Sequence, residues 1–124
     1  MATDTKIAWA PNQMRGTPFC EFVQSDDASG NGVEVIAAVT DSIPYVLGYM
    51  VEAVTACTVH LAHTAAAEGK TQITPEEHIG DNTTMPVRSF GCSVAGADSK
   101  NIGIVASKAS AVDILIWGYH QPAA

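Results

Sequence analysis

The residues best suited to chemistry lie in CTVHLAHTAAAEGK, residues 57–70. This segment carries His60 and His63, three residues apart, and Glu68 five residues further along. Histidine and glutamate are ligands of zinc and iron, so the segment raises the question of a metal site. The answer depends on its conformation, because a helix and a strand place residues three apart very differently.

The pattern of this segment favours a strand. β-branched residues, which are stiff at χ1 and suit strands, are frequent from position 51 to position 59. From Cys57 onward the apolar residues follow period two, with positions 57, 59 and 61 on one face. A helix stays the alternative because the segment is rich in alanine. On a strand His60 and His63 point to opposite faces, so we predict that no transition metal binds them. His60 then faces solvent or a partner, and His63 lies near a strand end.

Other catalytic patterns are weak. The spacing departs from the His-x-His pair of cupins and from the HExxH motif of zinc proteases. Residues 76–78, Glu-Glu-His, could serve acid–base chemistry, but they are interpreted as a solvated loop or a first helical turn after Pro75. We therefore predict no catalytic residue, metal or cofactor. A metal-dependent jelly-roll enzyme that uses His60, His63, Glu68 or His78 stays an alternative.

The elements that would position such residues are short strands. Each is β-branched or aromatic and is bounded by turn-forming residues, which indicates an all-β fold, an antiparallel, jelly-roll-like β-sandwich. Residues 1–32 differ, because they form an extended N-terminal arm with one short strand at 19–23, while 33–124 form the sandwich domain. The predicted strands of that domain are 33–40, 45–54, 57–64, 71–74, 84–90, 100–107 and 111–119.

The last predicted strand is apolar on both faces. Val112, Ile114 and Ile116 fall on one face, and Leu115 lies on the other face with two aromatic residues. Such a strand is either central in a sheet or covered by a partner. The two aromatic residues, Trp117 and Tyr119, are predicted to pack in the core or an interface, with a ligand-stacking platform as the alternative.

Composition limits the partners. The net charge is −7 and the six basic residues are scattered, so direct binding of nucleic acid is not expected. No apolar run is long enough to span a membrane, and the first residues lack a secretory signal, so the protein is expected to begin here and to be made in a cytoplasm. Charged residues make up only 15% of the chain, which favours a homo-oligomer over a compact alanine-rich monomer. The three cysteines are far apart and are predicted to be small buried thiols in a reducing compartment.

Three segments resemble the small virion proteins of tailed bacteriophages. They are GYMVEAVTACTVHLAHTAAAEGK, GDNTTMPV and NIGIVASKASAVDILIWGYH, and the resemblance covers residues 45–120. Such proteins are often trimeric β-sandwiches that decorate or cement capsids. The resemblance implies a structural protein on the capsid surface of a virion, with the major capsid protein as partner and with no catalytic residue. The alternative is a glycan-binding module for host attachment that uses Tyr45, Tyr49, Trp117 and Tyr119.

The N-terminal arm is the last expectation. Residues 1–18 are predicted to become ordered only by contact with another subunit, because a solvated tail rarely contains tryptophan. An extended arm of this length reaches about 55 Å, at about 3.3 Å per residue, and could add a strand to a neighbouring sheet. The alternative is an arm that folds back on its own sandwich. Together with Trp117 and Tyr119, the predicted interface residues are Ile7, Trp9, Met14 and Phe19.

Overall fold

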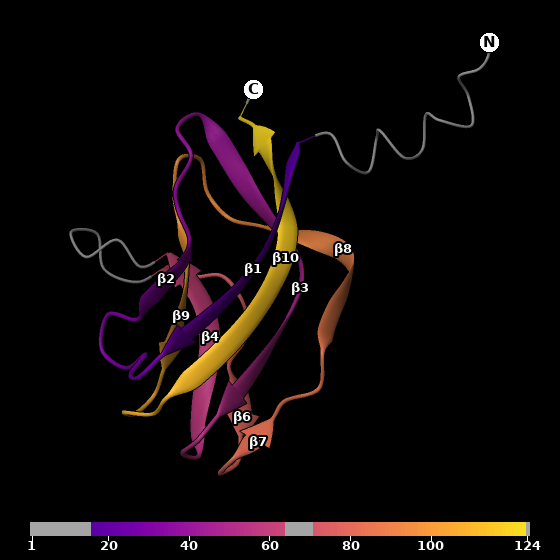
Figure 1. Ribbon diagram of the computed structural model, residues 1–124. Helices are drawn as coiled ribbons and strands as arrows, with labels where there is room; N and C mark the ends of the chain where they lie inside the picture. Colours follow the sequence, from indigo (N-terminus) through magenta and orange to yellow (C-terminus); the bar gives the residue numbers. More distant parts are fainter. Residues whose placement is uncertain (1–15, 64–70, 124) are drawn as a thin grey trace.

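The computed structural model describes residues 16–63 and 71–123. Within these residues the chain forms strands and turns and no helix, and the strands make two antiparallel sheets (Figure 1). The two sheets pack face to face around one hydrophobic core. The predicted all-β sandwich is therefore confirmed.

The first sheet is built on three long strands. β10 lies in its centre, between β1 and β3, and β3 also pairs with β7 and β8 at different points along its length. The nine residues of β1 pair with β10 without interruption. The strands of this sheet are β1 (Thr17–Ser25), β10 (Val112–Pro122), β3 (Ser42–Ala53), β7 (Thr83–Thr84) and β8 (Arg88–Ala95).

The second sheet is smaller. β9 and β4 form its centre, β2 is the edge beside β9, and both β5 and β6 pair with β4. The long strands alternate between the sheets along the chain, so β1 and β2 become the edge strands on the same side of the sandwich (Figure 1). The strands of this sheet are β2 (Val33–Ile36), β9 (Ile102–Ala106), β4 (Cys57–His63), β5 (Thr71–Gln72) and β6 (Glu77–Ile79).

Period-two patterns decide which residues fill the core. In β10, Val112, Ile114 and Ile116 are at most 1% exposed, whereas the residues between them are partly exposed. In β4, Cys57, Val59 and Leu61 face inward, as predicted. Because each strand places alternate side chains on opposite faces, these strands bury one apolar row and leave the other toward solvent.

A β-bulge interrupts this alternation in β3. Trp117 pairs with Gly48 and Gly118 pairs with Val46, so Leu47 has no residue opposite it. The extra residue reverses the faces on its two sides. Tyr45 lies on the outer side of the sheet, and Tyr49, four residues later, lies in the core with 1% of its surface exposed.

Three local predictions were wrong. The strand predicted at 84–90 is divided into β7 and β8, with Pro86 between them, since proline cannot donate to a ladder. The strand predicted at 71–74 ends at Gln72. The loop predicted at 76–78 contains β6, which pairs with β4 and shows that three residues suffice for a strand beside a long partner.

The N-terminal predictions are tested only in part. The strand predicted at 19–23 is β1, which is longer by two residues at each end. Thr17 and Pro18, assigned to the arm, belong to this strand. Ile7, Trp9 and Met14 lie outside the described residues, so their predicted interface role stays a prediction.

Candidate functional site

The outer side of the first sheet carries a row of apolar side chains that water reaches. Cross-strand pairing joins Phe22 to Leu115 and Leu115 to Met50, and it places Cys20 beside Trp117. Phe22 is 60% exposed, a large value for a phenylalanine in a strand. We call this surface the outer face. Its residues are Cys20, Phe22, Met50, Leu115, Trp117 and Tyr119.

Aromatic side chains form one end of the outer face. The rings of Tyr45 and Tyr119 stack with their centroids 5.1 Å apart and an interplanar angle of 11°. The Tyr119 hydroxyl lies 3.3 Å from the Ser93 hydroxyl. Trp117 lies across Gly48, where an added Cβ would be 2.4 Å from its ring. Glycine at this position therefore gives the indole room to lie against the sheet, and both aromatic residues of the predicted interface share this face.

The other end of the outer face is hollowed. A shallow depression of about 150 Å³ lies between Phe22, Met50 and Leu115, and Thr84 also contributes to it. Two carboxylates, those of Glu52 and Asp113, complete its lining. An apolar floor with acidic residues at its margin suits a partner side chain that is apolar at its tip and has a basic neighbour.

The cysteines depart from the prediction of buried thiols. Cys20 lies on the outer face and is exposed, whereas Cys57 is buried in the core. Burial raises the pKa of the Cys57 thiol, because a thiolate is poorly solvated there. Of these two thiols, that of Cys20 is the one placed to report on contacts at the outer face.

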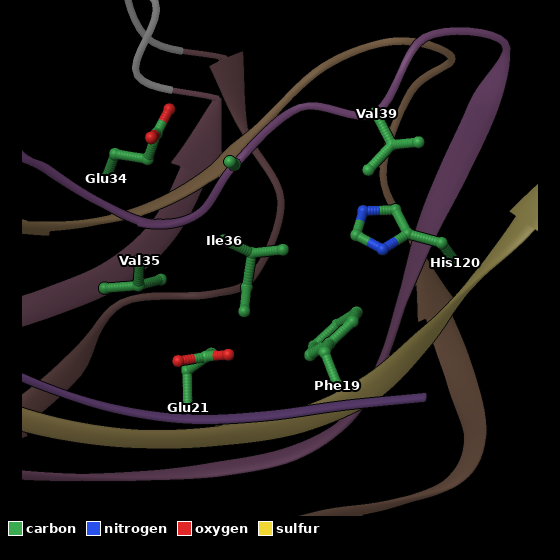
Figure 2. A pocket seen from close by; sticks show the side chains of 8 residues that line it. Phe19, Glu21, Glu34, Val35, Ile36, Val39 and His120 are labelled. Atoms are coloured by element: carbon green, nitrogen blue, oxygen red, sulfur yellow. The ribbon is translucent and has the colours of Figure 1, made fainter. Parts of the chain in front are cut away.

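The remaining predicted interface residue, Phe19, lies on the other side of β1. It packs against the core and forms one wall of a cleft of about 400 Å³ between the edge strands β1 and β2 (Figure 2). Sequence alternation put Phe19 and Phe22 on opposite faces but did not show which one faced inward. We call this space the β1–β2 cleft. Its lining residues are Phe19, Glu21, Glu34, Val35, Ile36, Ala37, Val39 and His120.

His120 places a polar ring against the apolar wall of this cleft. The ring lies 5.3 Å from that of Phe19, centroid to centroid, and faces Ile36 and Val39 (Figure 2). Its Nε2 atom is buried and has no hydrogen-bond partner within the described part of the chain. Burial lowers the pKa of His120, because the imidazolium is less well solvated there than in water.

The lowered pKa makes His120 a source of acid sensitivity. Below the ordinary value of 6.5 the unfolded chain binds more protons at this residue than the folded chain does, so stability falls as the pH is lowered through 6.5. We expect the urea midpoint to fall from about pH 7.5 to about pH 5.5, and to fall less in His120→Phe. The control is His78→Gln at an exposed histidine. An equal fall in His120→Phe and the unsubstituted protein would contradict this.

The two histidines of β4 are not a metal pair. His60 lies on the outer side of the second sheet, with Nδ1 3.9 Å from a carboxylate oxygen of Glu76. His63 is 8% exposed and points inward, where its Nε2 accepts a hydrogen bond of 3.1 Å from the Ala97 amide. Its other nitrogen, Nδ1, then carries the hydrogen and donates to the Asn101 carbonyl oxygen. His63 is thus a structural residue whose two ring nitrogens are both used.

The other candidate ligands are not brought into a three-residue site. Glu68 lies outside the described residues, and His78 is exposed on β6. Within 16–63 and 71–123, no group of three or more His, Cys, Asp or Glu side chains is placed to hold a metal ion. The prediction that His60 and His63 bind no metal still requires a measurement.

Glu77, one of the two carboxylates in the predicted loop, has a structural partner. Arg88 donates two hydrogen bonds to it, from Nε at 2.9 Å and from Nη2 at 2.7 Å. These bonds lower the pKa of Glu77, since they favour the carboxylate form. The pair links β6 of one sheet to β8 of the other. The sequence held no signal for this contact, because the eleven-residue separation follows no local rule.

No protein-family model matches the chain and a search of curated proteins finds no match. Among the described residues no helix is long and apolar enough to cross a membrane.

Proposed function

We propose that this chain is a structural protein that attaches to the exterior of a bacteriophage capsid through its outer face. The observation that carries the proposal is the contiguous apolar surface formed by β1, β10 and β3, with Phe22 60% exposed at its edge strand. Exposed apolar surfaces of this kind mark protein contacts, and aromatic residues and methionine are enriched in them.

Charge supports the same location. The chain carries a net charge of −7, which disfavours contact with packaged DNA and therefore suits the outer shell of a capsid. Glu52 and Asp113 lie beside the apolar residues of the outer face. The partner surface, which we propose is the major capsid protein, should therefore present apolar residues with a basic residue near them.

The strand order supports the resemblance to phage virion proteins. Without the two-residue strands β5 and β7, the sheets read β1-β10-β3-β8 and β2-β9-β4-β6. We propose that this is the eight-stranded jelly roll expected from the sequence, with its strands divided between two sheets. A homotrimer, decoration of the virion surface and the absence of catalysis complete the proposal, and they rest on the resemblance.

The substitution Phe22→Asp tests the attachment surface. It puts a charge in the middle of the apolar contact, so we expect the affinity for capsids to fall by about tenfold to a hundredfold, as burying an unpaired charge at an interface requires. Cosedimentation of purified protein with undecorated capsids measures this. Because the side chain is largely exposed, the unfolding temperature should change little.

Val54→Asp is the matched control, because Val54 is 54% exposed and lies in the turn after β3, away from the outer face. It should bind capsids as the unsubstituted protein does. Full capsid binding by Phe22→Asp, or equal losses in the two variants, would show that the outer face is not the attachment surface.

A glycan-binding module is the second candidate. The stacked Tyr45 and Tyr119 rings lie on the same face as Trp117, and exposed aromatic groups of this kind can stack on sugar rings. Tyr49 was predicted to belong to this platform and does not, because it is buried in the core. A glycan array separates the two functions, since a capsid-binding protein should give no specific glycan signal.

A further inference from the structure

The β1–β2 cleft has the construction of a receptor for a peptide segment. Both of its walls are edge strands, since β1 pairs only with β10 and β2 only with β9 among the described strands. Edge strands leave backbone donors and acceptors available to another chain. The cleft between them exposes apolar side chains that are continuous with the core, notably Phe19, Val35 and Ile36.

The cleft is chemically different at its two ends. Figure 2 shows the carboxylates of Glu21 and Glu34 toward one end and the imidazole of His120 at the other, with Ile36 and Phe19 between them. Glu34 also accepts a hydrogen bond of 2.9 Å from the Asn101 amide, which holds its carboxylate in place. A matching occupant is cationic at one end, apolar in the middle, and has a hydrogen-bond donor for His120 Nε2 at the other end.

This chain contains such a segment at residues 6–9, Lys-Ile-Ala-Trp, which lie outside the described residues. Lys6 supplies the cation, Ile7 supplies an apolar side chain, and the indole N–H of Trp9 is a donor with no acceptor function. Three residues of extended chain span about 10 Å, which separates the lysine and the indole along the cleft. Charge and polarity of the segment therefore match those of the cleft in the same order.

The place where the described chain begins also favours this occupant. Gly16 packs against the backbone of His120, where an added Cβ would overlap the His120 carbonyl oxygen, and it lines a hollow that His120 shares. The described chain therefore begins beside the cleft. To enter the cleft of its own subunit, the chain would have to reverse direction within residues 10–15. A neighbouring copy can offer its cleft without that reversal.

We propose that residues 6–9 of one copy occupy the β1–β2 cleft of a second copy, with Lys6 beside Glu21 and Glu34 and Trp9 beside His120. This exchange links subunits to one another, while the outer face attaches them to the capsid. The inference deepens the proposed assembly function and rests on it only in that copies of the chain meet. It is tested on purified protein without capsids.

Two full-length charge reversals, Lys6→Glu and Glu21→Lys, provide the test. Each puts like charges together at the proposed contact, so self-association should weaken about tenfold or more, measured by light scattering over a range of concentrations. Mixing the two variants should restore association. The unchanged segment of the Glu21→Lys variant then meets the unchanged cleft of the Lys6→Glu variant, and the two substituted positions meet with opposite charges. Recovery on mixing requires contact between different copies.

Matched controls are Lys108→Glu and Asp26→Lys, which reverse exposed charges outside the cleft and should leave self-association unchanged. Phe22→Asp should also leave self-association unchanged even where it abolishes capsid binding, which separates this inference from the proposed function. Single variants that associate normally would overturn the inference. Single variants that weaken association but do not recover on mixing would overturn it as well, since that result indicates binding within one chain or a different contact.

Discussion

Replacing Gly118 with alanine is expected to lower the free energy of unfolding by about 3 kcal/mol or more, as severe overpacking does. The Cβ of alanine would lie 2.0 Å from the Tyr45 carbonyl oxygen and 2.9 Å from the Phe19 ring. The carbonyl belongs to the backbone of β3, which pairs with β10 beside the bulge. It cannot move away without breaking the ladder that holds the centre of the first sheet.

Urea denaturation of Gly118→Ala measures this loss, and Gly80→Ala is its control. At Gly80 the nearest atom to an added Cβ is the Thr83 hydroxyl oxygen at 3.3 Å, so a small movement of a side chain relieves the contact. The control should change stability by less than about 1 kcal/mol. Equal stability of Gly118→Ala and the unsubstituted protein would mean that the close approach of β3 and β10 at the bulge is wrong.

Replacing His63 with leucine is expected to lower the free energy of unfolding by about 2–4 kcal/mol, because it removes the partners of two buried backbone groups. The Ala97 amide donates to Nε2 at 3.1 Å, and the Asn101 carbonyl accepts from Nδ1. Leucine has nearly the volume of histidine and cannot form either bond. Both groups lie in the connection between β8 and β9, so that connection should open first, which hydrogen exchange of the Ala97 amide measures.

His60→Leu is the matched control, on the same strand but on the outer side of the sheet, and it should cost much less stability. Zinc supplies a second readout. Adding equimolar zinc should leave the unfolding temperature of the unsubstituted protein unchanged, because the two histidines face opposite sides of β4. Zinc-dependent stabilisation that is lost in both variants would replace the structural role of His63 with a metal site.

Much of the fold could be predicted from local patterns, because burial of alternate side chains leaves a period-two signal. The alternation in β4 and β10 identified the inward residues of both strands before any pairing was known. The assignment of Trp117 and Tyr119 to one face, and of His60 and His63 to opposite faces, followed from the same signal. Boundaries were less certain where strands are two or three residues long, since a long partner strand stabilises them more than their own sequence does.

The sites depended more on tertiary structure. Sequence alternation separated Phe19 from Phe22, but each side of β1 contains a phenylalanine, so only packing against the core showed that Phe19 faces inward and Phe22 outward. The β1–β2 cleft had no sequence signal at all. It exists because strands from opposite sheets become neighbouring edges, and it brings Glu21, Glu34 and His120 together from three strands.

The sequence by itself determined that the chain forms a β-sandwich and which rows of side chains enter its core, because burial in a strand obeys a local two-residue period. Only the tertiary structure decided where that period breaks. Tyr45 and Tyr49 are an even number of residues apart and belong on one face of a regular strand, yet the bulge at Leu47 puts them on opposite faces. A bulge depends on the register of the neighbouring strand, and β10, which sets that register, lies far along the chain from β3, at Val112–Pro122.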